Sequence, residues 1–174
     1  MQELTIAPVE RGDIPSIGGI YREAVRHGTA SFELDPPDDE EMARRADILL
    51  TGGFPYFVAR RGGHLLGYAY AGPYRPRPAY RFTLEDSVYV DPAAHGQGIG
   101  SLLLARLIAE SERLGFRQMI AVIGDSANQG SIALHRRLGF CLTGVFESVG
   151  WKHGRWLDSV LMQRELGRGA SEPT

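Results

Sequence analysis

Apolar side chains recur along the chain with a spacing that differs between segments, and each spacing predicts a kind of element. Ile99, Leu103 and Leu107 follow at four-residue steps and Leu114 continues the stripe, which predicts an amphipathic helix ended by Gly115. Further helices are predicted for residues 14–27 with Asp13 as the cap, for the segment from Pro36-Pro37 to about residue 50, and for residues 128–138.

Shorter apolar segments between these helices predict strands. They are residues 4–8, 54–61, 64–72, 79–90, 118–123, 141–149 and 155–164. Gly62-Gly63 joins two of them as a hairpin, and Asp91-Pro92 ends the longest one. This order predicts one mixed α/β domain, with a hairpin region first and alternating strands and helices after it.

The composition narrows the class of protein. A chain of 174 residues has the length of one domain, and 43% hydrophobic with 23% charged residues excludes a disordered chain or a coiled-coil rod. Nineteen Lys and Arg against 21 Asp and Glu give a net charge of -2, so there is no basic field for nucleic acid. Cys141 is the one cysteine, which excludes an internal disulfide and a cysteine-based metal site. We expect it to be a small core residue.

Nothing in the sequence points to a membrane. The apolar runs are far shorter than a membrane span, and the first residues lack the basic and apolar regions of a signal peptide. We therefore expect a cytoplasmic protein. The polar segment 167–174 is expected to be disordered, which leaves residues 1–166 as the domain.

A glycine-rich turn, His95-Gly96-Gln97-Gly98-Ile99-Gly100, lies where a predicted strand gives way to a helix. Glycines let backbone N–H groups approach a phosphate closely, and a helix N-terminus adds partial positive charge. Taken alone, the turn is equally consistent with a tight connection that binds nothing. Two phosphate motifs are excluded: a P-loop needs a lysine here, and a dinucleotide fold needs an acidic residue within residues 118–122, which have none.

Two longer segments carry a family pattern. The first joins Ser87-Val88-Tyr89-Val90-Asp91-Pro92 to the glycine turn and to Ser101-Leu102-Leu103-Leu104, and the second joins Asn128 to residues 131–140. Together they resemble the acetyl-CoA segments of the GNAT superfamily of N-acetyltransferases, and the resemblance spans nearly the whole chain. It implies a single domain whose mixed, mostly antiparallel sheet is flanked by helices and splayed between two central parallel strands.

We accordingly expect acetyl-CoA as the co-substrate and no metal. The resemblance places CoA against the strand before the turn, the turn itself and one helix cap. These residues are Val88, Tyr89, Val90, His95, Gly96, Gln97, Gly98, Ile99, Gly100, Ser101 and Asn128. His95 stands where the family usually has Arg or Gln, and Asn128 could equally serve only as a helix cap.

Residues 69–75, 80–85 and 150–156 narrow the resemblance to the phosphinothricin and methionine sulfoximine N-acetyltransferases. The substrate is then expected to be a small amino acid or analogue with a second anionic or strongly polar group. The substrate contacts that this implies are Phe32, Arg75, Arg77, Tyr80, Glu85, Ser87 and Gly124. Guanidinium groups suit carboxylates and phosphinates, although a solvated loop is the simpler alternative in an arginine-rich chain.

Glu85 and His135 are the expected catalytic residues. Transfer to an amine needs a base, because an α-ammonium group is mostly charged at pH 7. Strand alternation alone favours Glu85 as a solvated carboxylate, on the face opposite Leu84 and Val88. The resemblance instead makes Glu85 the general base and gives His135 a role between acid and orienting group, although a packed histidine is the simpler alternative.

Other function classes remain open. A non-catalytic acyl-CoA-binding regulatory module would keep the glycine turn but need no base, and a related enzyme could acetylate peptide N-termini or another amine. We also expect a homodimer, because related enzymes pair through their C-terminal strands, and Trp151 and Trp156 would suit such an interface.

Overall fold

A seven-stranded sheet runs through the molecule in the spatial order β1-β2-β3-β4-β5-β7-β6. The computed structural model describes residues 2–172. The strands are β1 (Leu4–Pro8), β2 (Tyr56–Arg61), β3 (His64–Pro73), β4 (Thr83–Val90), β5 (Gln118–Gly124), β6 (Cys141–Lys152) and β7 (Arg155–Glu165). Neighbouring strands are antiparallel except β4 and β5, which are parallel. The expected mixed, mostly antiparallel sheet is confirmed.

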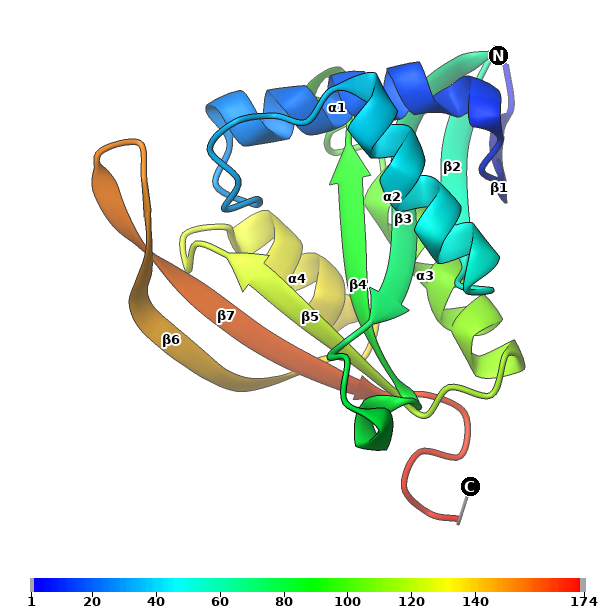
Figure 1. Ribbon diagram of the computed structural model, residues 1–174, viewed down its shortest axis with the longest axis vertical. Coiled ribbons are helices and arrows are strands. Elements are labelled where there is room, and N and C mark those ends of the chain that lie inside the picture. The colour runs from blue at the N-terminus through cyan, green and yellow to red at the C-terminus, as the bar shows by residue number, and fades with distance from the viewer. Residues whose placement is uncertain (1, 173–174) are drawn as a thin grey trace.

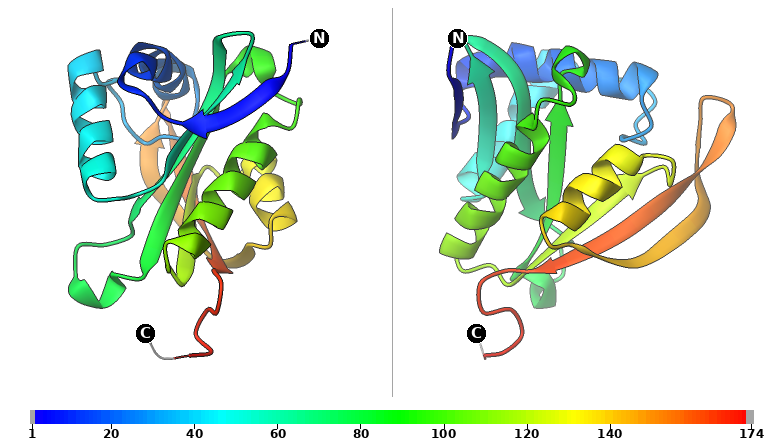
Figure 2. Two further views of the ribbon diagram at one scale, coloured as in Figure 1. Left: turned by 90° about the vertical axis from the view of Figure 1, so that its right-hand side faces the viewer. Right: turned by 180° about the vertical axis from the view of Figure 1, so that it is seen from behind.

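Helices cover both faces of the sheet. Among the described residues, α1 (Ile14–His27) and α2 (Asp39–Thr51) lie on one face, and α3 (Ile99–Arg113) and α4 (Gln129–Arg137) lie on the other (Figure 1, Figure 2). The β6–β7 hairpin projects from the body of the molecule (Figure 1). The expected single α/β domain flanked by helices is thus confirmed.

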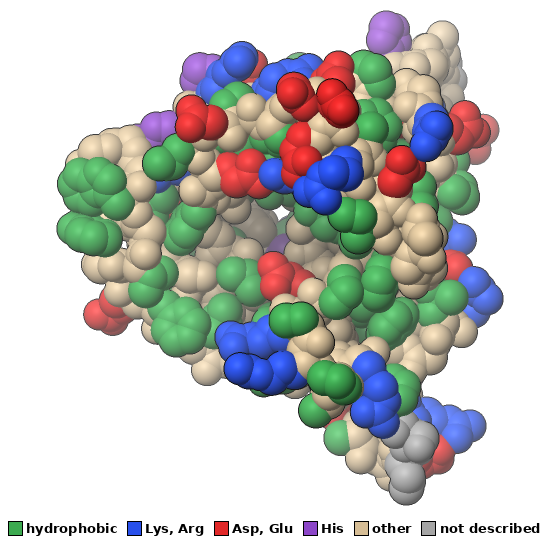
Figure 3. Space-filling model, viewed as in Figure 1, with side chains coloured by type: hydrophobic (Ala, Val, Ile, Leu, Met, Phe, Trp, Pro, Cys, Tyr) green, Lys and Arg blue, Asp and Glu red, His purple; other side chains and the backbone are tan. Residues whose placement is uncertain are grey.

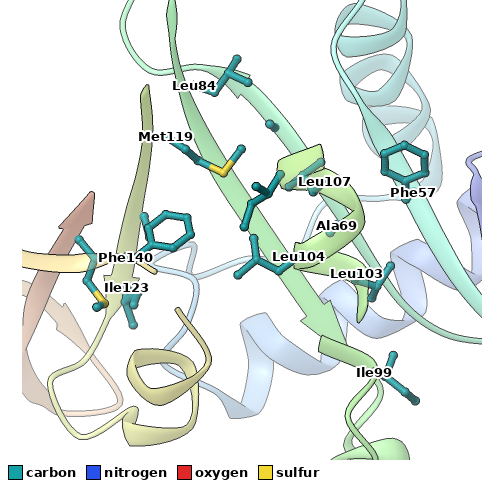
Figure 4. Packing of buried hydrophobic residues seen from close by; sticks show 14 of the residues in the cluster. Phe57, Ala69, Leu84, Ile99, Leu103, Leu104, Leu107, Met119, Ile123 and Phe140 are labelled. Atoms are coloured by element: carbon teal, nitrogen blue, oxygen red, sulfur yellow. The ribbon is translucent and has the colours of Figure 1, made fainter. Parts of the chain in front are cut away.

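Each face of the sheet has its own hydrophobic core. The larger core packs α3 and α4 against the sheet and contains the fully buried Leu84, Leu104 and Met119 (Figure 4). The smaller core packs α1 and α2 against the other face and contains Ile17 and Tyr68. Because successive strand residues point to opposite faces, neighbours along β4 enter different surroundings.

The parallel strands β4 and β5 separate towards their C-terminal ends. They pair from Thr83 opposite Gln118 to Asp86 opposite Ala121, and β4 then continues to Val90 beside β3 alone. The strands form a V in Figure 1, with α4 behind β5. The expected splay is confirmed, and we call this opening between β4 and β5 the fork.

Some local predictions are wrong. The strand predicted for residues 79–90 begins only at Thr83, because Pro78 has no N–H for a sheet and starts the 3₁₀ turn Pro78–Tyr80 instead. Cys141 is exposed at the start of β6 and is not a core residue. Leu114 is 40% exposed, because α3 ends one residue before it.

Asp13 also differs from the prediction, since its side chain does not cap α1. A 3₁₀ turn, Arg11–Asp13, precedes the helix, and the Asp13 carboxylate accepts a hydrogen bond from the Glu10 N–H at 2.8 Å. The same carboxylate pairs with Arg60 on β2. Asp13 therefore ties the start of α1 to the sheet.

The chain after β7 continues in turns through residue 172. Arg117 donates a hydrogen bond to the Gly169 carbonyl at 3.1 Å, which holds part of this segment against the body. The disordered tail expected for residues 167–174 lies partly outside the described residues, which exclude 173 and 174. None of the helices within residues 2–172 has the length and apolar character needed to cross a membrane.

Candidate active site

The fork contains a small cavity of about 50 Å³. Its walls come from β4, β5 and α4, which the topology brings to the open end of the sheet. Residues expected from the sequence to contact CoA or substrate, or to take part in catalysis, line it together: Ser87, Val88, Tyr89, Gly124, Asn128 and His135. The structure therefore unites residues that lie far apart in the sequence.

One edge of β4 is free inside the fork. Val88 and Val90 pair with Ala69 and Gly67 of β3, but neither has a partner in β5. Backbone N–H and C=O groups on this edge need hydrogen-bond partners, and an extended ligand with amide groups can supply them. The amide groups of the expected pantetheine arm are groups of this kind.

The glycine turn joins β4 to α3 with an open backbone. Gly96 and Gly98 have φ angles of 75° and 78°, in the left-handed region, and no atom lies within 4 Å of the position that a Cβ would take at either. Gly98 is the N-cap of α3, so no side chain satisfies the first N–H groups of the helix. Such an uncapped N-terminus suits a phosphate.

Three side chains around the turn have hydrogen-bond partners within the protein. His95 Nε2 lies 3.0 Å from the Val90 carbonyl oxygen, to which it donates, so the ring folds back onto its own chain. Arg61 donates to the Gln97 side chain at 2.7 Å. Arg137 lies 3.5 Å from Ser101 Oγ. Arg61 and Arg137 could not be identified from the sequence, because no local pattern distinguishes them from the many other arginines of the chain.

Asn128 is the N-cap of α4, and its side chain accepts a hydrogen bond from the Ser131 N–H at 3.2 Å. It also lines the cavity. Asn128 therefore caps α4 and faces the cavity, and its contact with CoA stays a prediction.

Glu85 is half-buried on the face of β4 that it shares with Tyr89, towards α1 and α2. Burial raises the pKa of Glu85 above its usual value, the charge of Asp86 raises it further, and Arg75 opposes both. Glu85 is thus not a fully solvated carboxylate. A carboxyl group with a raised pKa is better matched to accepting a proton near neutral pH.

His135 is buried, and both of its ring nitrogens have partners. Nδ1 donates to the Ser131 carbonyl oxygen at 2.7 Å, and Nε2 lies 2.9 Å from Oδ2 of Asp86. The ring packs edge-on against Phe140, with centroids 5.0 Å apart. Burial by itself lowers the pKa of His135, but the hydrogen bond and the charge of Asp86 outweigh it, so the pKa is raised overall.

Phe32 lies against two glycines at the edge of the fork. A Cβ on Gly124 would come within 2.9 Å of the Phe32 ring, and a Cβ on Gly150 within 2.5 Å. A Cβ on Gly124 would also come within 2.3 Å of the Thr29 carbonyl oxygen. The absence of side chains at these positions is what lets the Phe32 loop approach β5 and β6.

Polar contacts hold the Phe32 loop on both sides. Lys152, at the end of β6, donates to the Ser31 carbonyl oxygen at 2.6 Å. Glu33 accepts hydrogen bonds from Tyr21 of α1 at 3.1 Å and from Arg45 of α2 at 2.6 Å. The loop is therefore fixed to α1, α2 and the β6–β7 hairpin.

Arg75 and Arg77 are exposed on the loop between β3 and β4. The Arg75 guanidinium lies 5.2 Å from the centroid of the Tyr74 ring, which meets Tyr80 edge-on at 5.5 Å. Arg75 is the arginine whose charge opposes the raised pKa of Glu85. The face seen in Figure 1 is hollowed near its centre, and acidic and basic side chains gather around the hollow (Figure 3).

Asp86 is the site residue that the sequence analysis missed. Strand alternation places it on the same face as Leu84 and Val88, and a carboxylate on an apolar face is unusual unless it has a partner. Its partner is His135, which is 49 residues away in the sequence. The signal was therefore present, but the partner could not be found without the fold.

Groups of three or more His, Cys, Asp or Glu side chains that could hold a metal ion do not occur in the part of the chain that the structure describes.

Comparison with known proteins agrees with the geometry. Residues 20–140 match the family described as Acetyltransferase (GNAT) family. Phosphinothricin N-acetyltransferase of Alcaligenes faecalis is 57% identical over 165 residues, which cover 95% of this chain and 84% of that protein. The L-methionine sulfoximine/L-methionine sulfone acetyltransferase of Salmonella typhimurium is 39% identical over 168 residues, which cover 97% of this chain and 98% of that protein.

A solved structure is similar throughout. The crystal structure of a GNAT superfamily phosphinothricin acetyltransferase from Sinorhizobium meliloti in complex with AcCoA has a TM-score of 0.95 and 50% identity. The match covers 98% of this chain and 93% of that one.

Proposed function

Because this chain belongs to the GNAT acetyltransferase family, we propose that it transfers the acetyl group of acetyl-CoA to the α-amino group of a small amino acid. We propose a substrate of the phosphinothricin or methionine sulfoximine type, the substrates named for the relatives from Alcaligenes faecalis and Salmonella typhimurium. The observation that carries the proposal is the fork, whose free β4 edge lies between the glycine turn and the half-buried Glu85.

Acetyl-CoA fits the fork in three respects. The open N–H groups at the start of α3 would take the pyrophosphate, and Arg61 and Arg137 would add positive charge beside them. The free edge at Val88 and Val90 would pair with the pantetheine amides. This places the thioester deeper in the fork, towards the cavity that His135 lines.

The proposed reaction is a direct transfer. The amine nitrogen attacks the thioester carbon, a C–N bond forms, the C–S bond breaks and CoA leaves as a thiolate. Glu85 takes the proton that the amine loses, directly or through water, and its raised pKa suits that role. The thiolate takes a proton from solvent, and His135, which lines the fork and has a raised pKa, would stabilise its negative charge until then. No covalent enzyme intermediate is required.

The substrate would enter from the face of β4 on which Glu85 lies. Arg75, which is close enough to influence Glu85, would bind an acidic group of the substrate, and Arg77 on the same loop would bind a second one. Phe32, Tyr80, Ser87 and Gly124 would complete the pocket. Arg75 and Arg77 disfavour polyamine or aminoglycoside substrates, because like charges would meet at this loop.

The experiment that tests this function is release of CoA thiol from acetyl-CoA against a panel of amines. The panel contains phosphinothricin, methionine sulfoximine, a short peptide with a free N-terminus and spermidine. We expect the largest kcat/KM for the first two. A preference for the peptide would support the alternative enzyme class, and acetyl-CoA binding without thiol release for any amine would support a regulatory module.

We also propose that the protein acts in the cytoplasm as a homodimer. The β6–β7 hairpin exposes a group of large apolar side chains that a partner subunit would cover. Phe146, Val149, Trp151 and Trp156 are each more than half exposed, and Trp151 meets Trp156 edge-on at 5.2 Å. Exposed aromatic clusters of this kind are typical of interfaces.

A further inference from the structure

Asp86 is a buried carboxylate that the reaction described above does not use. Its side chain is 2% exposed on the face of β4 that packs into the larger core. Oδ2 faces His135, whereas Oδ1 is buried and has no hydrogen-bond partner among the described residues. A buried carboxylate is costly unless it is paired, so its presence here calls for a reason.

His135 is held in one orientation by two different acceptors. The Ser131 carbonyl can only accept, so Nδ1 must carry a hydrogen. Nε2 faces a carboxylate oxygen, so a second proton lies between Nε2 and Asp86. The ring cannot turn without breaking both contacts and its edge-on packing on Phe140.

The pair lies at the base of the fork. Asp86 opposite Ala121 is the last paired position before β4 and β5 separate, and both Asp86 and His135 line the cavity. A ligand paired with the β4 edge at Val88 and Val90 would direct its reacting end towards this point. The cavity of about 50 Å³ is also large enough for a water molecule that could donate to Oδ1.

We propose that Asp86 is a positioning residue of the acetyl transfer, which fixes the ring of His135 at the base of the fork and holds it as an imidazolium. This inference rests on the proposed function, because the transfer is the reaction that a charged His135 would serve. The positive charge of His135 stabilises the negative charge that develops on the leaving thiolate, which takes its proton from solvent, while Glu85 returns the amine proton to solvent. Asp86 acts through His135 and not on the substrate.

The charged groups around His135 fix the sign of the expected pH dependence. Asp86 from β4 is the charged group that raises the pKa of His135, the Ser131 carbonyl from α4 adds to it, and Phe140 is apolar. Arg136 and Arg137 on α4 are exposed. Without the Asp86 charge, the effect of burial would remain and the pKa of His135 would fall. The imidazolium would then be lost at a lower pH.

The first test is a titration of the His135 side-chain nitrogens by NMR in the full-length wild-type protein and in Asp86→Asn. Asparagine keeps the size of the side chain and an acceptor for Nε2, but removes the charge. We expect His135 to remain doubly protonated in the wild type above the ordinary histidine pKa of about 6.5, and to lose its proton at a lower pH in Asp86→Asn. A wild-type His135 that loses its proton at or below the ordinary histidine pKa of about 6.5 would overturn the proposal.

The second test measures kcat against pH for the same proteins. The ratio of Asp86→Asn to wild type should decrease as the pH rises, to about one-tenth or less at pH 8, with little change in KM for acetyl-CoA. Asp47→Asn, which removes an exposed carboxylate of α2, is the control and should follow the wild type. A constant ratio at all pH values would indicate a merely structural role.

A double mutant separates action through His135 from direct action. In a His135→Gln background, Asp86→Asn should have no further effect on kcat, whereas a full independent loss would contradict the proposal. The wild-type titration needs neither a variant nor an active substrate. It therefore tests the Asp86–His135 pair even if no amine in the panel is acetylated, and a failure of the proposed function remains distinguishable from a failure of this inference.

Discussion

Glu85 and Asp86 are adjacent in the sequence and have opposite surroundings. Glu85 faces the α1–α2 side, where it is half-buried within the influence of Arg75. Asp86 faces the core and is paired with His135. Two carboxylates in different environments can take different parts in one reaction, and here the first is half-buried and the second is buried.

Replacing Glu85 by Gln keeps the size of the side chain but removes the base. The rate at neutral pH should fall by about 10²–10⁴-fold, and the loss should shrink as the pH rises, because free amine then becomes abundant. CoA affinity should not change, since the glycine turn is untouched. The measurement is a pH–rate profile of thiol release, with Glu23→Gln on the exposed side of α1 as control. Full activity of Glu85→Gln at every pH would rule out Glu85 as the base.

Glu85→Gln is expected to lower the rate without lowering the stability of the fold. The pKa of Glu85 is raised in the folded protein, so the fold favours the protonated form and loses this contribution as the pH rises through the raised pKa. At neutral pH, Glu85→Gln should therefore be at least as stable as the wild type. Thermal unfolding of both proteins at pH 5 and pH 8 measures this difference in stability. A variant less stable than the wild type at pH 8 would show that the charged Glu85 carboxylate does not destabilise the fold.

Arg75→Ala and Arg77→Ala test the binding of the acidic groups. Each should raise KM for phosphinothricin by about 10- to 100-fold, because a charged hydrogen bond is lost, while KM for acetyl-CoA stays the same. Arg11→Ala, which removes an exposed arginine that pairs with Asp47, is the control. Steady-state kinetics with both substrates varied measures the two KM values. An unchanged KM for phosphinothricin in both variants would indicate that the two arginines lie on a solvated loop and do not bind the substrate.

At the scale of elements, the glycine turn owes its shape to backbone conformations that other residues rarely adopt. Gly98 has a φ of 78° at the N-cap of α3, and a side chain there would strain the turn. Gly98→Ala should weaken CoA binding by about tenfold. Gly53 has a similar φ of 75° and equally open surroundings at the end of α2, so Gly53→Ala introduces the same strain away from the fork.

Calorimetric titration with CoA distinguishes these two variants. Gly53→Ala should lose stability but bind CoA as the wild type does. Equal affinities for Gly98→Ala and the wild type would show that the turn does not hold the phosphates.

The elements with strong periodicity were predictable, and those set by local exceptions were not. Residues 14–27 and the stripe of α3 follow directly from their apolar spacing. The start of β4 was predicted too early, because Pro78 begins a 3₁₀ turn over residues that the apolar pattern had assigned to the strand. The burial of Asp86 depends on a helix from a distant part of the sequence, and no local pattern contains that information.

The same distinction applies to the candidate site. The strand-to-helix junction marked the glycine turn, and the family pattern led to Glu85 and His135. The structure brings Val88, Asn128 and His135 to one cavity. The arginines beside the turn and the contacts that hold the Phe32 loop are long-range pairs. Their partners become neighbours only when the sheet has formed, so alternation and spacing cannot reveal them.

At the scale of the whole molecule, the projecting hairpin predicts the oligomeric state. Sedimentation should give a dimer for the wild type and a monomer for Trp156→Glu, because a charge would be buried in the interface. Ile48→Glu changes an exposed apolar residue of α2, on another part of the surface, and should leave the dimer intact. A wild-type monomer at all concentrations would contradict the prediction.

In the proposed reaction, acetyl-CoA held in the fork gives its acetyl group to the α-amine of a phosphinothricin-type amino acid. The most direct measurement incubates the wild-type protein with acetyl-CoA and phosphinothricin and follows both products, thiol by a colorimetric assay and acetylated amine by NMR. We predict one thiol released for each acetyl group found on the α-nitrogen. Thiol release without an acetylated amine, or acetyl-CoA that binds and remains intact, would contradict the account.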